Sequence, residues 1–169
     1  MAALHESRQL VEAAFGDHPG LHAAEEWLVT HQQPLPDDEL VPTHGDISPK
    51  NFLITSDGPL MVDWDDMALA DPMRDLGPLL WWYFPPAEWP GFLERYGTML
   101  SRALNQRIYW WAACISLDVT AGLLEREYRE DAEGFLNDFL AARRRTAKPS
   151  SAVPRADPVI RIRPPDGAQ

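Results

Sequence analysis

The chain has 169 residues, which suits one domain, and its 45% hydrophobic and 24% charged residues are ordinary for a globular protein. Its formal net charge of −11 repels nucleic acid, so we expect no nucleic-acid partner. One cysteine excludes a disulfide within the chain, no apolar run is long enough to span a membrane, and no signal-peptide pattern opens the sequence, so we expect a cytoplasmic protein with no membrane partner.

The chain opens with two segments of helical periodicity. Apolar residues recur at helical spacing over residues 3–15 and again over about 21–31, and a Gly- and Pro-containing turn separates the two stretches. Residues 32–42 then hold three prolines and three consecutive acidic residues. We therefore expect two helices, followed by a loop that leads to Thr43.

A β-hairpin is predicted next. Two short apolar runs, NFLIT at residues 51–55 and LMVDW at residues 60–64, flank the pair Asp57-Gly58. Alternating strands joined through Asp-Gly are a strong hairpin signal, because both residues tolerate the backbone conformations of a tight turn.

Helices are predicted for the rest of the domain. Asp71 is a suitable N-cap and Pro72 a suitable first residue for a helix that begins at this point. Apolar periodicity then predicts three further helices, over residues 86–104, 106–128 and 131–145.

The composition changes at Arg143. Residues 1–142 contain 8 Lys and Arg against 24 Asp and Glu, whereas residues 143–169 contain 7 basic and 2 acidic side chains and are rich in Pro, Ser and Ala. We expect residues 1–142 to form the folded domain and residues 143–169 to form a basic, disordered tail.

Three polar residues around the predicted hairpin form a chemically distinctive set. Asp46 lies in the loop HGDISPKN, Asn51 ends that loop five residues later, and Asp63 ends the second strand. The hairpin brings Asn51 and Asp63 to neighbouring positions, with Asp46 just before them. Phosphoryl transfer needs hard oxygen ligands for Mg²⁺ and a carboxylate that orients the attacking hydroxyl, and this set supplies two ligands and one base.

HGDISPKN, VDWDD and DPMRDLG, in this order, resemble the catalytic segment of the aminoglycoside phosphotransferase and choline kinase-like family, which is related to the protein kinases. The resemblance implies that Asp46 is the catalytic residue and that Asn51 and Asp63 bind the metal. The match extends over residues 43–77.

The same resemblance implies supporting residues. His44 is expected to brace the loop, and the carboxylates of Asp71 and Asp75 are expected to support it and to cap the following helix. Asp65 stands where the family usually carries Glu, and we rank it behind the other candidates. Ser48 stands where protein kinases carry a Lys, so the contact made by that Lys is not expected in this chain.

The resemblance also implies a fold and a reaction. The expected fold is α+β and mostly helical: the C-terminal lobe of a protein-kinase-like fold, with the metal site on a short hairpin. The expected reaction transfers the γ-phosphoryl group of ATP, with Mg²⁺, to a hydroxyl of a small molecule. The acidic chain favours a cationic acceptor such as an aminoglycoside, and choline-like, homoserine-like and macrolide-like acceptors remain open.

The segment before His44 lacks two features that such a kinase needs. It contains no Gly-rich phosphate loop and no lysine, since the only lysines of the chain are Lys50 and Lys148. We therefore expect that the N-terminal sheet lobe is absent here, that it is supplied upstream or in trans, and that the surface it leaves exposed promotes self-association. The alternative is a non-catalytic binding or scaffold module that keeps the motif as ancestry.

Overall fold

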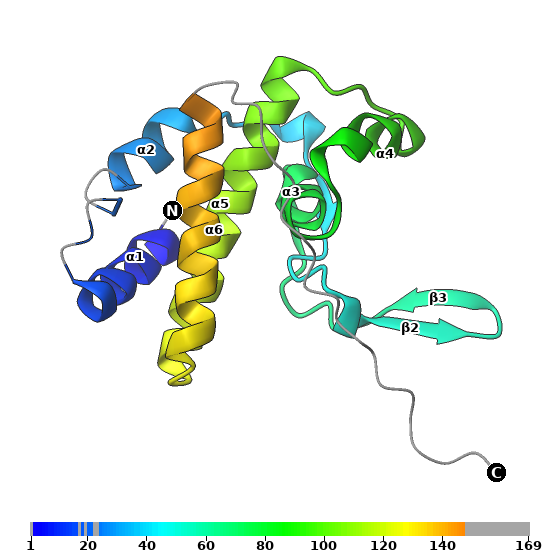
Figure 1. Ribbon diagram of the computed structural model, residues 1–169. Coiled ribbons are helices and arrows are strands. Elements are labelled where there is room, and N and C mark those ends of the chain that lie inside the picture. Colours follow the sequence, from blue (N-terminus) through cyan, green and yellow to red (C-terminus); the bar gives the residue numbers. More distant parts are fainter. Residues whose placement is uncertain (1, 17, 19, 22–23, 148–169) are drawn as a thin grey trace, which may run out of the picture.

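The computed structural model describes residues 2–147, except residues 17, 19 and 22–23 (Figure 1). These residues form a mostly helical structure with two small antiparallel sheets. The helices are α1 (Ala2–Phe15), α2 (Ala24–His31), α3 (Met73–Tyr83), α4 (Trp89–Tyr96), α5 (Arg102–Glu125) and α6 (Arg129–Ala147). The strands are β1 (Val41–Thr43), β2 (Phe52–Thr55), β3 (Gly58–Met61) and β4 (Ala68–Ala70).

Helix α5 is the central element of the fold. It runs through the middle of the molecule, with α6 beside it, α1 and α2 on one side and α3 and α4 on the other (Figure 1). Its buried side chains contribute to two apolar clusters, one shared with α1, α2 and α6 and the other shared with α3 and α4. A helix that is buried on several sides is apolar around much of its circumference, which the segment YWWAACISL reflects.

Helix α3 is fixed to α5 by a buried ion pair. Arg107 donates from Nε to Asp71 Oδ2 at 2.8 Å and also pairs with Oδ1 through Nη2, and Trp111 Nε1 donates to Oδ2 at 3.0 Å. Asp71 Oδ1 also accepts from the backbone N–H of Met73, the first residue of α3, at 2.8 Å, but the N-cap is Pro72 and not Asp71 as predicted. The helix itself begins at Met73, one residue after the predicted first residue Pro72.

The backbones of α3 and α5 approach closely at Gly77. A Cβ atom at this position would lie 2.9 Å from Ile108 O and 3.0 Å from Trp111 Cβ. Only glycine fits this contact without displacing α5, which explains a glycine inside an otherwise apolar helix.

The single helix predicted over residues 86–104 is wrong. A short 3-10 turn at Pro86–Glu88 leads into α4, which ends at Tyr96 because Gly97 adopts a left-handed conformation with φ 98°. The backbone N–H of Thr98 then donates to Leu93 O at 2.9 Å, which closes the helix end. Ser101 starts α5 by accepting the N–H of Leu104 at 3.1 Å.

One small sheet was predicted and the other was not. In the hairpin, Phe52 pairs with Met61 and Thr55 with Gly58, so the two-residue turn is Ser56-Asp57, one residue earlier than Asp57-Gly58. Strands β1 and β4 pair antiparallel with three residues each, and strands this short leave no periodicity to detect.

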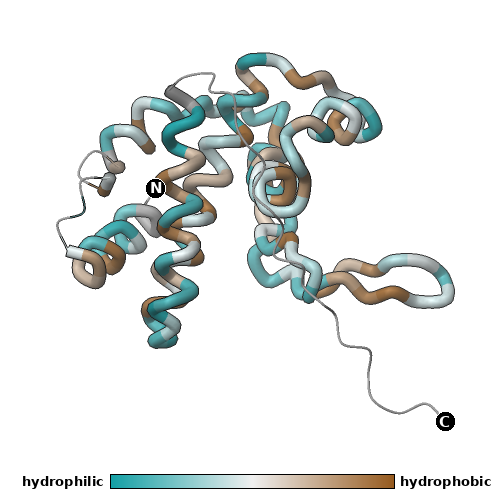
Figure 2. Tube along the Cα trace, viewed as in Figure 1, coloured by the Kyte–Doolittle hydropathy of each residue, from teal (hydrophilic) through white to brown (hydrophobic). Residues whose placement is uncertain are grey.

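The β2–β3 hairpin projects away from the helices and carries a run of apolar residues (Figures 1 and 2). Phe52, Leu53, Ile54 and Leu60 are all exposed, and Ile54 reaches 84%. We call these four residues the hairpin apolar surface. Among the described residues no third strand pairs with this hairpin. An isolated two-stranded hairpin is only marginally stable in water, so such an element gains stability when its apolar side chains are covered.

Helix α6 continues to Ala147, so residues 143–147, which the composition assigned to the basic tail, are helical. The remainder of the predicted tail lies outside the described residues. Within the described ranges, no helix combines the length and apolar character that crossing a membrane requires.

Candidate active site

The loop of residues 44–51 is held to α3 by one carboxylate. Asp75, in the first turn of α3, accepts the backbone N–H of His44 through Oδ2 at 2.6 Å and the N–H of Gly45 through Oδ1 at 2.9 Å. Each carboxylate oxygen of Asp75 thus accepts one of two consecutive backbone N–H groups. These two hydrogen bonds fix the position and the orientation of the start of the loop.

Gly45 is required where the loop crosses the next segment of chain. Its φ is 93°, and a Cβ here would lie 2.7 Å from Arg74 Nη2 and 2.7 Å from Asp66 O. Arg74 fills this space because its Nη1 donates to Thr43 Oγ1 at 2.9 Å and to Asp66 O at 3.0 Å. This guanidinium therefore ties β1 to the turn before β4.

His44 is buried and connects two parts of the site. Its Nδ1 accepts the backbone N–H of Asp46 at 3.2 Å, and its Nε2 lies 2.8 Å from Val62 O. These partners are compatible with the tautomer in which Nε2 carries the proton and donates to Val62. The imidazole also packs on the indole of Trp64, with ring centroids 4.6 Å apart.

Asp46 and Asn51 are in direct contact. The buried Asn51 side chain donates from Nδ2 to Asp46 O at 2.8 Å and to Asp46 Oδ2 at 3.0 Å. Lys50 Nζ lies 3.0 Å from the same Oδ2. Asp46 Oδ1 accepts no hydrogen bond from any described residue, and neither does the side-chain oxygen of Asn51. Each of the two side chains therefore has one oxygen without a hydrogen bond from the described residues.

Asp63 is placed next to Asn51 through Val62. The N–H of Val62 donates to Asn51 O at 3.0 Å, and the carbonyl oxygen of Val62 is hydrogen-bonded to His44 Nε2. The residue before Asp63 is therefore held through both of its backbone polar groups. Asp63 is exposed and has a left-handed backbone, with φ 68°. Such backbones are uncommon for residues other than glycine and often occur at functional sites. Asp63 follows β3 by two residues instead of ending it.

The donor set at this position is compatible with Mg²⁺ but is small. No group of three or more His, Cys, Asp or Glu residues that could hold a metal occurs in the described part of the chain. Mg²⁺ is usually bound by one or two carboxylates together with substrate phosphates and water. Asn51 and Asp63 provide an amide oxygen and a carboxylate that accept no hydrogen bond from residues the structure describes. Asp65 is an exposed residue within the turn from Trp64 to Met67.

Tyr83, at the end of α3, lies within electrostatic reach of this site. Partial burial raises the pKa of its hydroxyl above the usual range, and the negative charge of Asp46 raises it further. The positive charge of Lys50 acts in the opposite direction. The phenol is therefore close enough to Asp46 and Lys50 for both charges to act on it.

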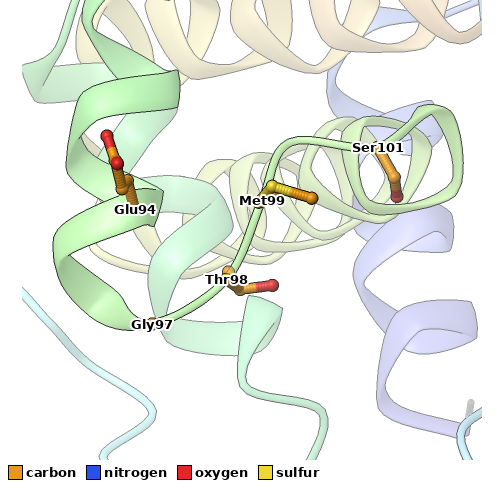
Figure 3. A pocket seen from close by; sticks show the side chains of 5 residues that line it. All are labelled: Glu94, Gly97, Thr98, Met99 and Ser101. Atoms are coloured by element: carbon orange, nitrogen blue, oxygen red, sulfur yellow. The ribbon is translucent and has the colours of Figure 1, made fainter.

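A hollow between α4 and α5 is the alternative location for a ligand (Figure 3). It contains one carboxylate, that of Glu94, and none of the residues predicted for the site; its lining is Glu94, Gly97, Thr98, Met99 and Ser101. The residues predicted for the site lie instead in the loop of residues 44–51, at Asp63 and at the start of α3.

Sequence reasoning missed three contributors to the site. Lys50 lies four residues after Asp46, and this spacing was a usable signal for an ion pair. Arg74 is part of the DPMRDLG segment, and a basic residue among acidic ones was likewise a signal that could have been used to predict a contact. Tyr83 left no signal, because only the packing of α3 brings it towards the loop.

The chain was compared with known protein families. The model of one family, described as the phosphotransferase enzyme family, matches residues 2–111. The match covers well over half of the chain and extends from α1 into α5, so it includes the loop of residues 44–51, Asp63 and Asp75.

A pair of glycine substitutions tests whether the crossing at Gly45 is as crowded as described. Gly45→Ala adds both a left-handed alanine and a Cβ clash, whereas Gly58→Ala, at φ 117° with nothing within 4 Å of the added Cβ, adds the backbone strain alone. The shared strain costs about 1–2 kcal/mol. We expect a clearly larger loss of unfolding free energy for Gly45→Ala, measured by urea denaturation. Equal losses for the two variants would contradict the crossing.

Proposed function

The chain belongs to the phosphotransferase enzyme family, and on that premise we propose that it transfers the γ-phosphoryl group of ATP to a hydroxyl of a small molecule. The observation that carries this proposal is the state of Asp46: Asn51 and Lys50 engage one carboxylate oxygen, while the other accepts no hydrogen bond from the described residues. The mostly helical structure with its small antiparallel sheets is compatible with the C-terminal lobe of a protein-kinase-like fold.

In the proposed reaction, Asp46 acts on the acceptor. Its Oδ1 accepts a hydrogen bond from the acceptor hydroxyl and takes the proton as the hydroxyl oxygen bonds to the γ-phosphorus. The bond between the γ-phosphorus and the β–γ bridging oxygen breaks, and the electron pair leaves with ADP. Asn51 Nδ2 donates to the carboxylate oxygen Oδ2 and to the backbone carbonyl of Asp46, so the base is oriented before the acceptor arrives.

Asn51 and Asp63 would hold Mg²⁺, because they lie on adjoining segments and each has an oxygen that is not bonded by any described residue. The ion, when bound, neutralises charge on the phosphates. The position of Asp63 is set by its neighbour Val62. The carbonyl of Val62 is bonded by His44 and its N–H by Asn51, so the backbone leading into Asp63 is held in place.

The charge of the domain favours a cationic acceptor. Residues 1–142 contain 24 acidic against 8 basic side chains, which produces a negative potential that attracts amine-bearing alcohols such as aminoglycosides. A panel of aminoglycoside, choline-like, homoserine-like and macrolide-like alcohols separates these acceptor classes.

We also propose that a nucleotide-clamping lobe, on a longer chain or in trans, covers the hairpin apolar surface. Phe52, Leu53, Ile54 and Leu60 are exposed on a hairpin that pairs with no third strand from the described part of the chain. Burying these side chains under a second lobe would stabilise the complex by about 25 cal/mol for each Å² of apolar surface removed from water. This free energy favours docking.

Replacement of the base tests the proposed reaction. Asp46→Asn keeps the size of the side chain but cannot take a proton, so turnover with ATP and the acceptor panel should fall by about 10²–10⁴-fold. Asp57→Asn, in the exposed hairpin turn, is the matched control and should retain activity. Turnover that is the same in Asp46→Asn and in the parent protein would rule out Asp46 as the base.

The proposed second lobe is tested with an extended protein and with a charged substitution in the hairpin apolar surface. A protein extended by the sequence encoded upstream in the same reading frame should turn over faster than the present chain. Within the extended protein, Ile54→Asp should reduce turnover because it places a charge in the covered surface, whereas Val29→Asp, at a 57% exposed position on α2, should not. Identical behaviour of the two variants would contradict docking at the hairpin.

A further inference from the structure

We propose that Lys50 binds the transferring phosphoryl group, and that its ion pair with Asp46 is the resting state of this cation. The inference rests on the proposed phosphotransferase function and assigns to that site the residue that contacts the donor phosphate.

The ion pair is placed at the position of the chemistry. Lys50 Nζ lies 3.0 Å from Asp46 Oδ2, and the same oxygen accepts from Asn51 Nδ2 at 3.0 Å. Two donors therefore converge on Oδ2, while Oδ1 has none among the described residues. The Lys50 side chain is 69% exposed, so its ammonium can leave this oxygen without moving the backbone.

Two other basic side chains near the loop are held by hydrogen bonds or an ion pair within the fold. Arg74 is held by Thr43 Oγ1 and Asp66 O, and Arg107 is held in the buried pair with Asp71. Lys50 is the only lysine among the described residues, and Lys148 is the second lysine of the chain. Of these basic residues, Lys50 alone combines high exposure with a contact to Asp46.

The chemistry of the step needs such a cation. The transferring phosphoryl group spreads negative charge over its oxygens, and stabilising this charge is a main task of the protein. An ammonium on a flexible four-carbon stem is a mobile point charge that can follow a phosphate, unlike the planar guanidinium of Arg74 in its fixed contacts. Exposed ion pairs are weak, so a phosphate with more negative charge competes successfully with one carboxylate.

The movement leaves the proposed base in place. When Lys50 moves to the phosphate, Asn51 Nδ2 still donates to Oδ2 at 3.0 Å, and Oδ1 has no donor among the described residues in either position of Lys50. The alternative is an ion pair between neighbouring turns of the loop with no contact to substrate.

The two lysines of the chain allow a direct spectroscopic test. Selective ¹³C labelling of lysine Cε gives two resonances in this chain, and loss of one in Lys50→Arg assigns Lys50, with Lys148 as internal reference. We expect MgATP to shift the Lys50 resonance, MgADP to shift it much less, and Lys148 to stay unchanged. The measurement is made on whichever form, the present chain or the extended protein, transfers phosphoryl groups.

Kinetics supply the second readout. Lys50→Met should lower kcat/KM for ATP by about 10- to 100-fold, and Lys50→Arg should recover part of this loss because the charge returns. Arg126→Met removes one positive charge at the exposed end of α5 and should leave the kinetics unchanged.

The outcomes separate this inference from the proposed function. Turnover with an unshifted Lys50 resonance, or Lys50→Met kinetics equal to those of Arg126→Met, would overturn the role of Lys50 alone. Absence of phosphoryl transfer in both protein forms would overturn the proposed function and this inference together.

Discussion

The structure depends on the carboxylate of Asp75, which accepts the backbone N–H groups of His44 and Gly45 at 2.6 and 2.9 Å. This pair of hydrogen bonds is the direct link between the helical body and the loop that carries the predicted chemistry. Because Asp75 lies in the first turn of α3, and Asp71 just before that helix is paired with Arg107, the loop is positioned relative to α5.

From this link the site is built outwards by backbone contacts. His44 reaches Val62 O, Asn51 accepts the N–H of Val62, and the chain then presents Asp63 with its left-handed backbone. The site is rigid where it joins the core and exposed where it meets the hairpin. The proposed docking of a second lobe uses this exposed hairpin apolar surface, next to the loop that Asp75 holds.

The sequence predicts those features that short-range rules govern. Asp57-Gly58 indicated the hairpin to within one residue, and the five-residue spacing of Asp46 and Asn51 indicated a shared site, where the structure places a hydrogen bond. The break at Gly97 was missed because apolar periodicity continues across it. The approach of Tyr83 to the loop depends on how α3 packs, and tertiary packing leaves no local pattern.

Amide hydrogen exchange at His44 and Gly45 tests whether Asp75 holds the loop, because in the structure both N–H groups donate to this side chain. In the parent protein both amides should exchange slowly. In Asp75→Ala they should exchange rapidly, while the amide of Leu117 in the buried part of α5 stays protected as a control for folding. Unchanged protection at His44 and Gly45 in Asp75→Ala would show that the loop is held by other contacts and would contradict the role of Asp75 described here.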